Sequence, residues 1–167
     1  HTIIDRTPLK GRQPGEWLAE INAALKDVLP MGQFATAFIG VFDTATDLLT
    51  YAAAGAPSPV FGNPDGTVEL LDSSGLFLGV SKRTVYPDRT HPFPKGSFLL
   101  TYSDALIEEV VDGRAALEEE GLKAMVERLL PRKLDKPMKA LTEEFFTLYK
   151  RPPLGDDLTS IWISRPA

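Results

Sequence analysis

Residues 95–108 read KGSFLLTYSDALIE, and this stretch carries the clearest structural signal in the 167-residue chain. The turn-forming pair Lys95-Gly96 leads into the apolar run Ser97–Tyr102, which predicts a buried β-strand. Asp104 follows at the end of that run. A carboxylate at a strand end can be held rigidly and directed into a cleft, as hard divalent cations require. Aspartate is also common in turns and as a helix N-cap, so both roles stay open for Asp104.

A second aspartate takes a comparable position near the end of the sequence. Asp156 follows Gly155 in a predicted turn and opens the predicted strand Leu158–Ile163. Asp104 and Asp156 are far apart along the chain, so a shared cation requires their two strands to meet at one end of the core. Convergence of the two carboxylates is therefore what a shared metal site would require, and a turn role stays open for Asp156 as well.

The chain before residue 95 reads mostly as β-structure. Aromatic and β-branched residues alternate there and are separated by Gly, Pro and Asp clusters, which is typical of short strands and turns. The expected elements are a hairpin at residues 34–42 and 48–54, short strands at 60–61 and 67–71, a packed turn at 75–80, and an irregular or edge-strand region at 87–94.

Three helices are predicted from apolar residues at helical spacing. They cover residues 13–29, 114–130 and 137–149, and Gly121 interrupts the second pattern. Many antiparallel strands with a few helices, and no regular βαβ alternation, imply an α+β fold. The aromatic residues in these helices favour core packing or a helix-mediated homodimer over a ligand site. They are Trp17, Phe145, Phe146 and Tyr149.

Composition narrows the class of protein. With 43% hydrophobic and 25% charged residues, residues 1–167 are expected to form one globular domain. The net charge of −5 and the lack of a basic cluster argue against nucleic acid as a partner. Because there is no cysteine, disulfides and thiolate metal ligands are excluded, which fits a reducing cytoplasm. No apolar run approaches the roughly 20 residues that span a membrane.

Five segments in order resemble the SpoIIE-like branch (RsbU-type) of the metal-dependent type-2C (PPM) protein serine phosphatases. Residues 95–108 are similar to the family's "G-D-hydrophobic-TDG-hydrophobic-E" segment, and Gly155–Thr159 matches its terminal "DD-x-T" element. The paired core strands are matched by residues 34–43 and 49–57, and a glycine-flanked turn by residues 75–79. The resemblance implies a layered α-β-β-α sandwich of two mostly antiparallel sheets flanked by helices.

The resemblance also implies a mechanism. In the family, two metal ions, Mn²⁺ or Mg²⁺, activate a water molecule that attacks the phosphorus of a phosphoserine. On the matching positions Asp104 and Asp156 are the expected catalytic metal ligands, and Asp157 and Thr159 are expected to support them by hydrogen bonds. No nucleophilic side chain is required.

Three departures from the family pattern bear on activity. The family's first metal motif, an Asp followed by Gly-His-Gly, precedes the helix of residues 13–29 and is not in this sequence, so we expect an N-terminally truncated domain that binds metal weakly. Ser103 and Ala105 replace the Thr and Gly of "TDG", and a methyl group at Ala105 would crowd the backbone if φ there were positive. Ala56 stands where the family often has a histidine.

Two functions therefore remain in view. The favoured one is the phosphatase output domain of a bacterial signalling protein that hydrolyses phosphoserine on a regulatory protein, such as an anti-sigma-factor antagonist in a partner-switching circuit. An N-terminal sensor or receiver domain is expected in the full-length protein. The alternative is a catalytically degenerate module that binds a regulator without turnover, which Ser103, Ala105 and Ala56 motivate.

Overall fold

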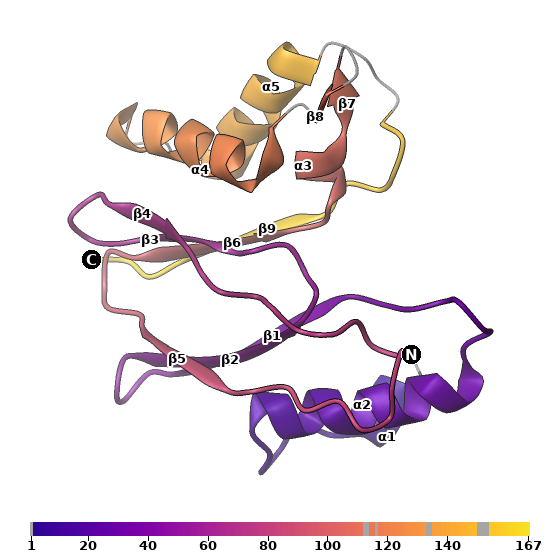
Figure 1. Ribbon diagram of the computed structural model, residues 1–167. Coiled ribbons are helices and arrows are strands. Elements are labelled where there is room, and N and C mark those ends of the chain that lie inside the picture. Colours follow the sequence, from indigo (N-terminus) through magenta and orange to yellow (C-terminus); the bar gives the residue numbers. More distant parts are fainter. Residues whose placement is uncertain (1, 112–113, 116, 133–134, 150–153) are drawn as a thin grey trace. The chain divides into compact units, whose positions relative to one another are not determined.

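The computed structural model describes residues 2–111, 114–115, 117–132, 135–149 and 154–167 (Figure 1). These residues fall into two compact units, residues 1–56 with 73–93 and residues 57–72 with 94–167. Each unit has its own antiparallel sheet and its own hydrophobic core. Within the described ranges, no helix is both long enough and apolar enough to pass through a bilayer.

The first unit contains two helices and a three-stranded antiparallel sheet, whose strands lie in the order β1-β2-β5. Its core is formed mainly by apolar side chains of α2 and β2, with Leu18 and Ala52 fully buried. β5 is an edge strand, as the proline-rich sequence around it predicts. The elements are α1 (Thr2–Arg6), α2 (Pro14–Val28), β1 (Ala37–Asp43), β2 (Leu48–Ala54) and β5 (Arg89–Pro92).

Helix α2 begins where the local sequence favours a start. Pro14 occupies the first turn, and Gln13 and Glu16 form a reciprocal capping box. The helix then lies so close to the chain at Tyr86 that only glycine fits at position 15. A Cβ on Gly15 would come 2.0 Å from the Tyr86 carbonyl oxygen.

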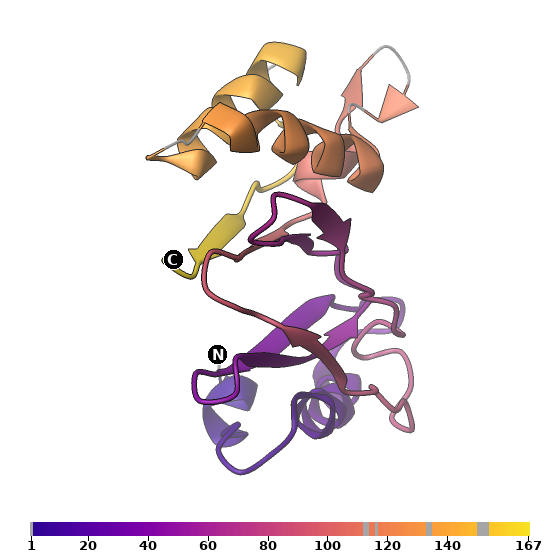
Figure 2. The ribbon, with the colours of Figure 1, turned by 90° about the vertical axis from the view of Figure 1, so that its left-hand side faces the viewer.

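The second unit contains a four-stranded antiparallel sheet in the order β4-β3-β6-β9. Helices α4 and α5 pack against each other and against this sheet (Figure 2). Their buried residues include Leu122 and Phe145, which join Leu100 of β6 in one core. The sheet elements are β3 (Val60–Gly62), β4 (Val68–Leu70), β6 (Phe98–Tyr102) and β9 (Ser160–Ser164). The others are α3 (Ala105–Glu108), β7 (Val110–Val111), β8 (Arg114–Ala115), α4 (Glu118–Leu129), η1 (Leu130–Arg132) and α5 (Pro137–Tyr149).

The expected α+β class, with two antiparallel sheets and accompanying helices, is confirmed. The helix predicted for residues 114–130 was wrong at its start, because β8 occupies Arg114–Ala115 and α4 begins only at Glu118. The β7–β8 pairing was missed as well, because strands of two residues are too short to show an alternating pattern. Helix α3 was also missed, because its four residues are too few to show helical periodicity.

Two glycine-to-alanine changes, both in helices, should have opposite effects on stability. Gly15→Ala should lower the free energy of unfolding by about 2–3 kcal/mol, because the new methyl group meets a backbone carbonyl that cannot turn away. Gly121→Ala in α4 should raise it by about 0.5–1 kcal/mol, since its Cβ would contact only the Leu117 side chain at 3.6 Å. Urea unfolding of both variants measures this, and a Gly15→Ala protein as stable as wild type would contradict the packing described for α2.

Candidate active site

The pairing of β6 with β9 sets the positions of both predicted aspartates. The antiparallel register places Tyr102 opposite Ser160 and Leu100 opposite Trp162. β6 therefore ends where β9 begins, and the segments after β6 and before β9 emerge at the same end of the sheet. Asp104 lies in the first segment and Asp156 in the second, so the register itself brings the two carboxylates into one region.

Ser103 connects these two segments by hydrogen bonds. Its backbone amide donates to the Thr159 carbonyl at 2.8 Å, which extends the ladder beyond the strands. Its hydroxyl donates to the Asp157 carbonyl at 2.9 Å and accepts from the Thr159 amide at 2.9 Å. The serine that replaces the family's threonine thus makes a complete set of hydrogen bonds to the loop that carries Asp156.

The end of β6 is anchored from its other side by Tyr102. The phenol donates to the Ser58 carbonyl at 2.8 Å, and the Ser58 amide donates to Oε1 of Glu119 in α4 at 2.7 Å. Burial, with a smaller contribution from the negative charge of Glu119, raises the pKa of Tyr102. The phenol therefore stays protonated at neutral pH and keeps its donor role, which fixes the strand immediately before Asp104.

The two aspartates line one cavity of about 280 Å³. Asp104 caps α3, with Oδ1 accepting from the Ala105 amide at 2.9 Å, and Oδ1 of Asp156 accepts from the Asp157 amide at 2.7 Å. Within the described residues, Oδ2 of each carboxylate has no hydrogen-bond donor. The N-cap role of Asp104 is thus real, and it leaves one oxygen of this residue for another ligand.

Ala105 does not have the backbone conformation that would make a methyl group costly. It is the first residue of α3, and it is not among the residues with positive φ. Its side chain is buried with those of Leu106 and Ile107. The replacement of glycine by alanine is therefore compatible with this backbone and favours the short helix.

Asp157 and Thr159, the expected supporting residues, contact Ser103 through their backbones. Asp157 is exposed and does not line the cavity, and its carbonyl accepts the Ser103 hydroxyl. Thr159 is exposed as well, and its amide and carbonyl both bond to Ser103. Ala56 belongs to the other unit, where its carbonyl accepts from Ser73 Oγ at 2.6 Å.

The carboxylates of Asp104 and Asp156 are of the chemical type that binds hard divalent cations. Carboxylate oxygens are preferred ligands of Mg²⁺ and Mn²⁺, which bind six groups and commonly keep several waters. In number the site is incomplete, because among the described residues no cluster of three or more His, Asp and Glu side chains could hold a metal ion. Asp104 and Asp156 thus have the chemistry of cation ligands, but the described residues alone do not complete a cation site.

Sequence patterns did not identify Glu109 as part of this region. It lines the same cavity, directly after Glu108, where the recognised motif ends. Its carboxylate accepts a hydrogen bond from the Gly155 amide at 2.6 Å. Spacing gives no sign of this contact, because it joins residues from distant parts of the chain.

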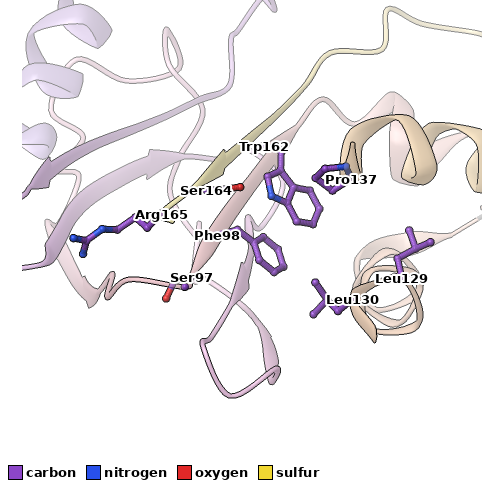
Figure 3. Close-up of a pocket in the computed structure, with 9 residues that line it drawn as sticks. Ser97, Phe98, Leu129, Leu130, Pro137, Trp162, Ser164 and Arg165 are labelled. Atoms are coloured by element: carbon purple, nitrogen blue, oxygen red, sulfur yellow. The ribbon is translucent and has the colours of Figure 1, made fainter. Parts of the chain in front are cut away.

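A second cavity of the same unit differs in its chemistry (Figure 3). Its volume is about 250 Å³. The rings of Phe98 and Trp162, stacked with centroids 4.1 Å apart, face Leu129, Leu130 and Pro137. None of the described residues that line it carries a carboxylate. The predicted ligands Asp104 and Asp156 line the other cavity.

Comparisons with known proteins place the chain in a family. Phosphoserine phosphatase RsbU of Bacillus subtilis (strain 168) is 25% identical over 163 residues, which cover 97% of this chain and 48% of RsbU. This chain thus spans about half the length of that curated relative.

Several solved structures have a fold similar to that of this chain. The SiaA-PP2C domain of Pseudomonas aeruginosa superposes with a TM-score of 0.81 at 18% identity, over 98% of this chain and 66% of that one. The structure of the RsbU and RsbW domains of Rv1364c from Mycobacterium tuberculosis gives a TM-score of 0.77 at 23% identity. The match covers 99% of this chain and 46% of that one. RsbX, solved in complex with magnesium, gives a TM-score of 0.65 at 17% identity. The match covers 96% of this chain and 68% of that one. These likenesses show that the chain has the PP2C phosphatase fold.

The family comparison covers nearly the whole sequence. The model described as Stage II sporulation protein E (SpoIIE) matches residues 1–166. The chain belongs to the SpoIIE family.

Proposed function

We propose that this chain is the phosphatase output domain of a bacterial signalling protein and that it hydrolyses phosphoserine on a regulatory protein. The single observation that carries the proposal is the convergence of Asp104 and Asp156 on one cavity at the shared end of β6 and β9. Membership of the SpoIIE family and the likeness to RsbU support it. In this proposal residues 1–167 form one phosphatase-like domain.

Asp104 and Asp156 are the proposed catalytic metal ligands. When bound, Mn²⁺ or Mg²⁺ would supply an activated water and neutralise negative charge on the phosphate oxygens. The protein's part is to hold the two carboxylates rigidly: α3 fixes Asp104, and the hydrogen bonds of Ser103 fix the loop of Asp156. Asp157 and Thr159 are the proposed supporting residues, acting through the backbone bonds already described.

The partner and the setting are further parts of the proposal. The net charge of −5 suits a protein substrate better than a nucleic acid. The family resemblance suggests an anti-sigma-factor antagonist as the phosphorylated substrate in a partner-switching circuit. It also suggests an N-terminal sensor or receiver domain and a cytoplasmic location. Phe146 and Leu148 leave apolar surface exposed on α5, which is suited to a homodimer contact.

The degenerate binding module is the less favoured function. It was motivated by Ser103, Ala105 and Ala56. Ser103 keeps three hydrogen bonds to the loop, and Ala105 adopts a helical backbone that accepts a side chain. Only the missing imidazole at Ala56 still motivates it.

Removal of one proposed ligand should abolish turnover. In the full-length protein, Asp104→Asn should lower kcat on a phosphoserine protein substrate by about 100-fold or more, because several kcal/mol of metal-dependent stabilisation is lost. Asp135→Asn, which changes an exposed aspartate of the same unit, serves as the matched control and should turn over at the wild-type rate. The assay is phosphate release with and without Mn²⁺. Turnover that is independent of metal, or retained in Asp104→Asn, would rule out the mechanism.

Restoration of the family glycine separates the two functions. Ala105→Gly should lower the free energy of unfolding by about 1 kcal/mol, because glycine is a poor helix former, and it should not increase kcat. Thermal unfolding and steady-state kinetics of the full-length variant measure both effects. A wild-type protein that is inactive with Mn²⁺ and becomes active on this change would support the degenerate module.

A further inference from the structure

The carboxylate of Glu109 and the amide of Gly155 form a contact across the candidate active site. The Gly155 amide donates to Oε1 of Glu109 at 2.6 Å, and both residues line the cavity shared by Asp104 and Asp156. A hydrogen bond to an ionised acceptor is short and roughly twice as strong as a neutral one. Gly155 directly precedes Asp156, so this bond acts on the backbone that carries the second aspartate.

Glu109 is held at a fixed position relative to Asp104. Asp104 is the N-cap of α3 and Glu109 is its C-cap. The residues between them include the buried Leu106 and Ile107, which tie the helix to the core. The hydrogen bond between Glu109 and Gly155 therefore connects the loop of Asp156 to the helix that begins after Asp104.

The loop is thus held on both sides of Asp156. Glu109 bonds to Gly155 on one side, and Ser103 bonds to Asp157 and Thr159 on the other. Asp104, Asp156, Glu108 and Glu109 all line one cavity, so their like charges repel one another. Without these bonds the repulsion would favour a loop position with Asp156 farther from Asp104.

We propose that Glu109 is a positioning residue that holds Asp156 opposite Asp104 before any cation binds. This role rests on the proposed metal-dependent function and adds a residue that the recognised motif does not include. Glu109 acts through its hydrogen bond to Gly155, so an acceptor oxygen is what the position requires. Loss of the bond should weaken cation binding, because the free loop must then be ordered at the moment of binding.

Three variants of the full-length protein test the role. Glu109→Ala removes the acceptor, whereas Glu109→Gln keeps an amide oxygen at the same place and removes only the charge. Glu108→Ala is the matched control, because it removes a carboxylate that lines the same cavity, whereas the Gly155 amide donates to Glu109. Two quantities are measured: amide hydrogen exchange at Gly155 without metal, and the Kd for Mn²⁺ by calorimetry.

In Glu109→Ala we expect exchange at Gly155 to be about tenfold faster and the Kd for Mn²⁺ to rise about tenfold, the lower end for loss of a supporting hydrogen bond. Glu109→Gln should restore most of both quantities. Glu108→Ala should leave exchange at Gly155 at the wild-type rate.

Three results would overturn the proposal. One is wild-type exchange in Glu109→Ala. Another is a Glu109→Gln protein that binds Mn²⁺ as weakly as Glu109→Ala although its Gly155 amide still exchanges slowly. That result would mean that the charge of Glu109 acts on the cation directly. The third is faster exchange in Glu109→Ala across β6 and the core, which would indicate general destabilisation. The exchange measurement needs no metal and no turnover, so an inactive wild-type protein would count against the phosphatase function alone.

Discussion

The antiparallel register between β6 and β9 is the constraint on which the candidate site depends. Tyr102 pairs with Ser160, so the end of one strand and the start of the other coincide. Asp104 and Asp156, far apart in sequence, then need only short segments to reach the same cavity. A register shifted by one residue would turn every side chain of β9 to the opposite face, so Trp162 could not stack on Phe98. The core packing thus also determines that both aspartates lie at the same end of the sheet.

The elements predicted well are those with a long, regular pattern. The strand Ser97–Tyr102 and the helix ending at Tyr149 lie where apolar spacing places them. The predicted convergence of Asp104 and Asp156 on one region is found in the structure, although spacing alone gave no register. Their role as ligands stays a prediction, because it rests on family resemblance and on the chemistry of carboxylates.

The features missed from the sequence are short or non-local. Four residues cannot show a helical period, so α3 was read only as part of a motif. The concern over Ala105 assumed a positive φ, whereas the N-cap Asp104 starts a helix there. The bond from Gly155 to Glu109 joins two distant segments, and only the folded register brings them together. Sequence similarity thus predicted the site residues, and the tertiary structure shows the contacts of the segments that carry them.

Binding of Mn²⁺ followed by NMR tests the central claim most directly. The paramagnetic ion broadens amide signals close to it, so the affected residues locate the site without an activity assay. If Asp104 and Asp156 hold a common cation, the amides of Ala105 and Asp157 should broaden together as Mn²⁺ is added. Broadening near only one of the two aspartates, or around Phe98 and Trp162 instead, would contradict the account.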